Sequence, residues 1–312
     1  MKHMLCLALL GLTPLLLNSC GSDADETPPL VGSTQTNAGA AGSAYQKALA
    51  ADQAGNSKKA AKLYGKMADA YPTAPDAAQA RFRQAQLLEQ QGEMVAAFDA
   101  YSTFVKRYPG SKLYSQALER EKAISQMALD GNVKSGFLLG SKLDTTKLVE
   151  MLGKVRDAAP QAASAPKAQF QIGQVYQEKG KAAESIAAYR KVVADWPDST
   201  QAPEAQYRIG MILIEQAKRG NQDTGNLDRA REALEDYLSL YPNGARAGAA
   251  KSQISQLNQQ DVQRSLDVAN FYKRKGDHES ARFYYREVLK KHGSGPLHDQ
   301  AQAGLKSLSS AE

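Results

Sequence analysis

One pattern of residues occurs five times in this chain and limits what it can fold into. A Gly is followed five residues later by a small residue, four residues further by Tyr or Leu, and eight residues further by Pro. The copies are Gly55-Ala60-Tyr64-Pro72, Gly92-Ala97-Tyr101-Pro109, Gly180-Ser185-Tyr189-Pro197, Gly225-Ala230-Leu234-Pro242 and Gly276-Ala281-Tyr285, the last with Gly293 in place of Pro. A period of roughly 30–50 residues is typical of a solenoid, whose stacked units form one extended binding surface.

Each position of the pattern has a physical explanation in a pair of helices. Gly fits the turn between the helices because it adopts a positive φ at little cost, and Pro ends the second helix. The small residue allows close approach of the helices. In the first helix of each pair, a bulky residue precedes a small one by three positions: Tyr45/Ala48, Phe82/Ala85, Phe170/Gly173, Tyr207/Gly210 and Leu266/Ala269. An Ala-rich helical bundle is the alternative, but two patterns in fixed phase favour the solenoid.

Over roughly residues 44–293, these positions resemble the tetratricopeptide-repeat (TPR) family. The predicted fold is therefore an all-α, TPR-type solenoid of about six helix pairs. Residues 44–110 hold repeats one and two, residues 111–160 one degenerate repeat, and residues 161–312 the remaining repeats and a capping helix at 297–309. In the degenerate repeat Leu143 stands at the Gly position, after a Gly/Ser-rich connection at 131–142, and residues 218–225 are an insertion.

The N-terminus has the composition of an export signal. Lys2 precedes an apolar run at residues 5–17, which is too short to span a bilayer. Residues 17–20, Leu-Asn-Ser-Cys, resemble the bacterial lipobox, which implies cleavage after residue 19 and a covalent lipid on Cys20; an incidental cysteine near a signal cleavage site is the alternative. Residues 20–43 have no apolar periodicity and are predicted to be a flexible tether. In Gram-negative lipoproteins, an Asp directly after the lipidated cysteine commonly retains the protein at the inner membrane. This chain has Gly21 at that position. The resemblance therefore implies that the protein is located at the periplasmic face of the outer membrane of a Gram-negative bacterium.

The residues expected for chemistry are missing from the sequence. The chain has 39 Lys and Arg, 33 Asp and Glu, and a formal net charge of +6, but the export signal and the scattered basic residues argue against nucleic acid. There is no His-Glu-x-x-His motif, no Gly-x-Ser-x-Gly motif and no phosphate-binding Gly loop. Asp144 is better interpreted as a helix N-cap than as part of a site. We therefore expect no enzyme activity, no metal and no cofactor other than the lipid on Cys20.

The resemblance to TPR proteins implies that the first helices of the pairs line a groove for a partner. The groove residues carried over from the family are Phe82, Gln86, Gln90, Phe170, Gln174, Gln177, Tyr207 and Met211. Amides and aromatic rings suit an extended or helical peptide segment. Packing between repeats is an equally good explanation for the three aromatic residues.

The C-terminal third carries a more specific resemblance. Residues 226–243, Asn-Leu-Asp-Arg-Ala-Arg-Glu-Ala-Leu through Tyr-Pro-Asn, precede a predicted long helix at 245–275 that ends Val-Ala-Asn-Phe-Tyr-Lys-Arg-Lys-Gly. This resembles the BamD, or ComL-like, lipoproteins of the outer-membrane β-barrel assembly machine. Two departures from the family are an additional repeat on the N-terminal side and a single helix after Gly293, at 297–309, where the family has a complete pair. In addition, Arg282 stands in place of the second Ala of the motif.

This second resemblance implies particular partners. They are the other subunits of the machine, chiefly the barrel-inserting outer-membrane protein, and segments of unfolded outer-membrane proteins. The subunit-docking end would include Asn270, Tyr272, Lys273 and Arg274. The alternative is a general periplasmic TPR adaptor for cell-wall, Tol-Pal or secretion complexes, in which the helix at 245–275 would break near Asn258.

Overall fold

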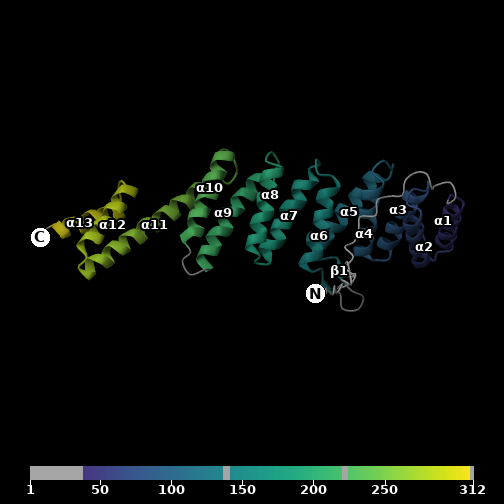
Figure 1. The fold of residues 1–312 in the computed structure, drawn as a ribbon, viewed down its shortest axis with the longest axis horizontal. Coiled ribbons are helices and arrows are strands. Elements are labelled where there is room, and N and C mark those ends of the chain that lie inside the picture. The colour runs from purple at the N-terminus through teal and green to yellow at the C-terminus, as the bar shows by residue number, and fades with distance from the viewer. Residues whose placement is uncertain (1–37, 136–140, 220–223, 310–312) are drawn as a thin grey trace, which may run out of the picture.

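A computed structural model describes residues 38–135, 141–219 and 224–309. The helices form a single elongated row, with α1 at one end and α13 at the other (Figure 1). The predicted signal peptide, the predicted lipidation site Cys20 and most of the predicted tether lie outside the described residues. No helix in the described ranges combines the length and the apolar character needed to cross a membrane.

The described residues form thirteen helices and one short hairpin. The first six helices are α1 (Ala38–Gln53), α2 (Ser57–Ala70), α3 (Ala77–Gln90), α4 (Met94–Arg107), α5 (Tyr114–Leu129) and α6 (Thr145–Ala158). The others are α7 (Ser164–Glu178), α8 (Ala182–Asp195), α9 (Ala202–Arg219), α10 (Thr224–Leu240), α11 (Ala247–Lys275), α12 (His278–Lys291) and α13 (Pro296–Ser309). Consecutive helices pack as six pairs, and α13 caps the last pair. The predicted all-α fold of about six pairs is confirmed.

The glycine turns follow the predicted pattern in four of the five copies. Gly55, Gly92, Gly180 and Gly276 have φ angles of 76°, 78°, 69° and 78°, which only Gly adopts without strain. The prediction is wrong for Gly225, which lies in the first turn of α10 because the insertion moves the connection upstream.

The third pair also differs from the prediction. Gly131 has a φ of 75° directly after α5, so the turn glycine is present and Leu143 does not replace it. The extra residues follow this turn as an antiparallel hairpin of β1 (Lys134–Ser135) and β2 (Ser141–Lys142), in which Lys134 pairs with Lys142. The Asp144 carboxylate then caps α6 by accepting a 2.8 Å hydrogen bond from the Lys147 backbone N–H, as expected.

Small residues allow large ones to fill the space between helices. A Cβ on Gly173 would lie 2.5 Å from Cε1 of Tyr189, and one on Gly210 would lie 2.8 Å from Leu234. Both large side chains are fully buried, as the repeat pattern predicts. The Ser185 hydroxyl, at the small-residue position of α8, donates a buried 2.8 Å hydrogen bond to the Gly173 carbonyl. The pattern therefore describes the contact between the helices of each pair.

The start of α1 differs from the predicted range, whereas the extent of α11 agrees with it. Helix α1 begins at Ala38, inside the segment predicted to be a tether up to residue 43. Ala is the best helix former, and Ala41 is buried against the first pair, which explains the extension. The long helix predicted at 245–275 is confirmed as α11, whose 29 residues are continuous through Asn258.

Candidate partner-binding surfaces

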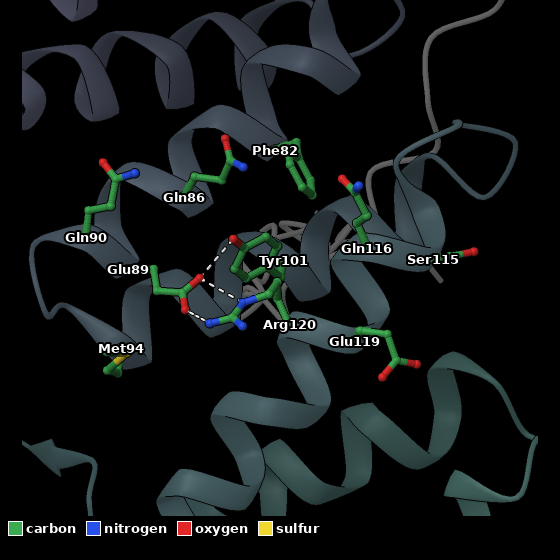
Figure 2. Close-up of a pocket in the computed structure, with 10 residues that line it drawn as sticks. All are labelled: Phe82, Gln86, Glu89, Gln90, Met94, Tyr101, Ser115, Gln116, Glu119 and Arg120. Carbon is green, nitrogen blue, oxygen red and sulfur yellow. Dashed lines mark hydrogen bonds and ion pairs between the residues drawn. The ribbon is translucent and has the colours of Figure 1, made fainter.

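The first candidate surface is a cavity of about 790 Å³ between α3, α4 and α5, which we call the N-terminal groove (Figure 2). It brings together three residues predicted from the sequence, Phe82, Gln86 and Gln90. Its other side includes Met94 at the start of α4 and Gln116 and Arg120 on α5, which were not predicted from the sequence.

Phe82 forms the apolar wall of this groove. Its ring makes edge-to-face contacts with Tyr101 and Phe104, at centroid distances of 5.7 and 5.6 Å, and only 5% of the residue is exposed. Gln86 is half-buried and Gln90 is exposed. Phe82 is therefore mainly a packing residue, whereas the two amides are accessible to a ligand.

The groove is crossed by an ion pair that the sequence did not suggest. The Tyr101 hydroxyl donates to Oε2 of Glu89 at 3.0 Å, and Nε of Arg120 donates to the same oxygen at 3.2 Å (Figure 2). A second guanidinium nitrogen of Arg120 bonds the other oxygen of Glu89. One carboxylate thus joins three successive helices, α3, α4 and α5.

The same arrangement recurs in two other layers. An acceptor on the first helix receives a Tyr hydroxyl from 12 residues later and an Arg from 31 residues later. We call this arrangement the Tyr–acceptor–Arg clamp. The three clamps in the structure are Asp52/Tyr64/Arg83, Glu89/Tyr101/Arg120 and Gln177/Tyr189/Arg208. Each clamp fixes a pair of helices to the first helix of the following pair.

The clamps have clear electrostatic consequences. Hydrogen bonds from Arg83 hold the pKa of the Asp52 carboxyl below its usual range. Burial raises the pKa of both Tyr64 and Tyr101 to about 12. The hydroxyls therefore stay protonated at neutral pH and act as hydrogen-bond donors to the acceptor.

The predicted groove residues in the middle of the chain are mostly engaged in packing. Phe170 lies between the Tyr189 ring, at 5.1 Å, and the Arg208 guanidinium, at 5.2 Å. Tyr207 lies between the Tyr237 ring, at 6.0 Å, and Arg246, at 5.4 Å.

The polar and sulfur-containing side chains of the middle region are placed differently. The side-chain oxygen of Gln177 accepts the clamp hydrogen bonds from Tyr189 and Arg208. Gln174 and Met211 are half-buried and take part in no clamp in the part of the chain that the structure describes. None of these residues lines the N-terminal groove.

The C-terminal end presents a run of four aromatic rings, Phe271, Tyr272, Tyr284 and Phe283. Successive centroids are 5.5, 5.7 and 5.3 Å apart, and the two central Tyr rings are stacked with 6° between their planes. The two Phe residues are 47% and 59% exposed, which is unusual for large apolar side chains. We call this surface the aromatic end.

The predicted docking residues surround this run in different ways. Asn270 accepts a 2.6 Å hydrogen bond from Tyr285, and Lys273 donates a 2.6 Å bond to Ser307 on α13. Tyr272 is part of the stack, and Arg274 is exposed. Asn270 and Lys273 thus hold the last helices together, while the side chain of Arg274 is accessible to solvent.

These surfaces and the stacked helix pairs define a TPR scaffold for protein–protein interaction. Residues 45–112 match the tetratricopeptide-repeat family. Residues 141–310, more than half of the 312, match the family described as outer membrane lipoprotein YfiO. The chain therefore belongs to the YfiO (BamD) family of outer membrane lipoproteins, which is not known to be catalytic.

Several solved structures are similar in part. The MamA protein is 18% identical, with 69% of this chain and 92% of that chain covered and a TM-score of 0.32. A tetratricopeptide repeat protein from Parabacteroides merdae is 10% identical, with 87% and 99% covered and a TM-score of 0.30. Pseudomonas aeruginosa pilF is 13% identical, with 86% and 99% covered and a TM-score of 0.28. These TM-scores are too low to carry an argument. No curated protein matches the chain.

A signal in the sequence could have revealed the clamps. Arg83 and Arg120 are 37 residues apart, the same distance as Asp52 and Glu89 or Tyr64 and Tyr101. A search for polar residues that recur at this 37-residue spacing would have found the three positions in the first two clamps. Within the described ranges, no group of three or more His, Cys, Asp or Glu residues is arranged to hold a metal ion.

Proposed function

We propose that this protein is a non-enzymatic scaffold of outer-membrane β-barrel assembly. The observation that carries the proposal is the family match over residues 141–310, which spans the long helix α11 and the aromatic end. In this proposal the aromatic end docks on the barrel-inserting outer-membrane protein. The lipid on Cys20 anchors the chain to the periplasmic face of the outer membrane of a Gram-negative bacterium.

The chemistry of the aromatic end supports a docking role. Exposed aromatic rings flanked by cations are enriched at the centres of protein interfaces. Phe271 and Phe283 supply apolar area, and Lys275 lies 5.7 Å from the centre of the Phe271 ring. With Arg274 beside them, these residues suit a partner surface that combines an apolar patch with carboxylates.

The N-terminal groove supports the second part of the proposal, which is capture of unfolded barrel segments. An unfolded β-strand offers alternating apolar side chains and unpaired backbone groups. Gln86, Gln90 and Gln116 offer amides to that backbone, and the wall formed by Phe82 and Met94 offers apolar contact. The groove is suited to short extended segments of varied sequence.

A general periplasmic TPR adaptor remains the second candidate. One observation favours it: residues 45–112 match the broad TPR family, and the lipoprotein family match begins only at residue 141. An adaptor would bring cell-wall enzymes, Tol-Pal components or secretion proteins to the membrane.

Co-purification after light crosslinking of envelopes tests the proposal. We expect the barrel-inserting protein to be recovered in near-equal amount with the wild-type chain. Its recovery should fall by about tenfold in Arg274→Glu, a variant in which Lys273 keeps its hydrogen bond to Ser307, and further in Lys273→Glu/Arg274→Glu. Lys58→Glu/Lys59→Glu on α2 is the control with the same change of charge at exposed positions of the other end.

The result can also reject the proposal. Recovery of cell-wall enzymes or Tol-Pal components with no barrel-inserting protein would reject the role in barrel assembly and support the adaptor function. Equal loss of the barrel-inserting protein in the α2 control would show that docking does not depend on the aromatic end.

A further inference from the structure

Helix α11 is long enough to serve two layers of the solenoid. Its 29 residues correspond to a length of about 43 Å, whereas the other helices have 14–18 residues. Its N-terminal part packs on α10 and its C-terminal part on α12. Leu257 belongs to the apolar core shared with α10, and Val262 belongs to the core shared with α12. The two cores are separated along the middle of α11.

The middle of α11 borders a hollow of about 620 Å³. Its floor is a single face of α11, formed by Lys251, Ile254, Asn258, Asp261 and Val262. Lys251, Ile254, Asn258 and Val262 follow one another at spacings of three or four positions, with Asp261 beside the last of them, and together they cover about 16 Å, or three helical turns. Leu238 of α10 lines one side and the end of α12 the other. We call this feature the α10–α12 hollow.

The shape and polarity of the floor fit a helix. Ile254 and Val262 lie two turns apart with Asn258 between them, so the apolar positions follow the spacing of a helix–helix seam. A partner helix with apolar residues every third or fourth position can pack alongside them. The amide of Asn258, in the centre of the seam, would fix the register because a polar side chain there requires a polar partner.

The charges around the hollow favour an acidic occupant. Asp261 is already paired with Arg231 and with Arg264, the latter at 3.5 Å. Arg231 is further occupied by Asp228. Lys251 and Lys291 are exposed, one on α11 and one on α12, and have no ion pair within the described residues. Two cations that lack counter-charges within the described residues therefore border the hollow, Lys251 on α11 and Lys291 at the end of α12.

We propose that the α10–α12 hollow binds an acidic amphipathic helix of about three turns, supplied by a protein partner. The apolar face of this helix packs on the half-buried Ile254 and Leu238, beside the buried Val262. Its carboxylates pair with Lys251 and Lys291. This site is separate from the residues assigned to the aromatic end and does not depend on the barrel-assembly function.

A photo-crosslinking experiment tests this site in the full-length protein in its own envelopes. A photoreactive phenylalanine replaces Asn258 in the hollow or, as a control, Gln260 on the opposite face of α11. Mass spectrometry of the adduct then identifies the captured segment by sequence. We expect an adduct at position 258 and little at 260, with a segment of net negative charge and apolar residues every third or fourth position.

Charge reversal then tests the mechanism of binding. Lys251→Glu/Lys291→Glu should reduce the yield of the adduct, and the affinity of a synthetic peptide of that segment, by about tenfold. Lys58→Glu/Lys59→Glu, at exposed positions of α2, makes the same change of charge outside the hollow and should leave both within about twofold. Melting curves show that all variants are folded.

Four outcomes would overturn the proposal. They are a lack of adduct at position 258 above that at 260, capture of lipid or a second copy of this chain, capture of a basic or non-amphipathic segment, and equal effects of the two charge reversals.

Discussion

The two ends of this solenoid are held together by different interactions. Around the N-terminal groove, Asp52 and Glu89 each collect a Tyr hydroxyl and an Arg, so that three successive helices share one carboxylate. At the aromatic end the corresponding Tyr285 donates to Asn270 at 2.6 Å, and the neighbouring rings stack instead. The N-terminal end buries its aromatic rings, whereas the C-terminal end exposes two of them.

This structural difference suits the two ends to different kinds of partner binding. A groove whose walls are joined across layers is preorganised, so little conformational entropy is lost when a short segment binds. Exposed rings at the end of a chain favour a larger, permanent contact that covers them. The comparison thus agrees with transient capture at one end and stable docking at the other.

The largest expected effect comes from filling the closest contact in the clamped region. Gly173→Val should destabilise the protein by about 3 kcal/mol or more, because the site of its Cβ is occupied by the Tyr189 ring. Thermal or denaturant unfolding measures the loss. Gly248→Ala, at an exposed helical position with no atom nearby, is the control and should be neutral or slightly stabilising. A neutral Gly173→Val would show that the layers are not closely packed there.

The second prediction concerns the layer in which the clamp is missing. Ala128 stands at the acceptor position of the third pair, and nearby Glu121 is fully buried, with the Ser102 side chain as a polar neighbour of its carboxyl. Burial raises its pKa from 4.5 to about 7. Because the folded state holds the proton more tightly, stability falls as the pH rises from about 4.5 through about 7, by about 3 kcal/mol in total.

Glu121→Gln should remove this dependence. We expect the variant to be more stable than wild type at pH 8 and to have no advantage near pH 4.5, as measured by urea unfolding across that range. Glu150→Gln is the matched control with the opposite sign, because hydrogen bonds from Lys154 lower the pKa of that exposed carboxyl. If Glu121→Gln were destabilising at pH 8, the buried carboxylate would have to be stabilised by a partner.

The third prediction removes one clamp hydroxyl. Tyr101→Phe should cost about 1–2 kcal/mol, because Glu89 loses a hydrogen bond in a partly buried site. Tyr108→Phe is the control, since that hydroxyl is buried without a partner in the described part of the chain, and its removal should cost nothing. Equal costs for the two substitutions would mean that the clamp adds nothing beyond packing.

The smallest effect on stability is expected at the aromatic end. Phe283→Ser should change the free energy of unfolding by about 0.5 kcal/mol or less, because the side chain is 59% exposed. The same variant should clearly reduce recovery of the docked partner. Stability measured alongside recovery distinguishes a docking residue from a core residue, and a large loss of stability would assign Phe283 to the core.

Features repeated in the sequence were predicted well, and features made by contacts across layers were not. The helix pairs, the capping helix and the length of α11 follow from local patterns such as Gly276 with φ of 78°. The clamps were not predicted because Arg120 and Glu89 are 31 residues apart and Arg120 does not belong to the family pattern. The exposure of Phe283 was not predicted either, because apolar residues of a helix are expected to face the core. The hairpin after Gly131 could not be separated from an irregular loop by composition.

The most direct test of the account is photo-crosslinking from both ends of the chain in the same cells. A photoreactive residue at Phe283 reports on the aromatic end, and one at Gln90 reports on the N-terminal groove. The account predicts that position 283 captures the barrel-inserting outer-membrane protein and that position 90 captures segments of unfolded barrel proteins. Capture of cell-wall or secretion proteins at position 283, or of the same partner at both positions, would contradict it.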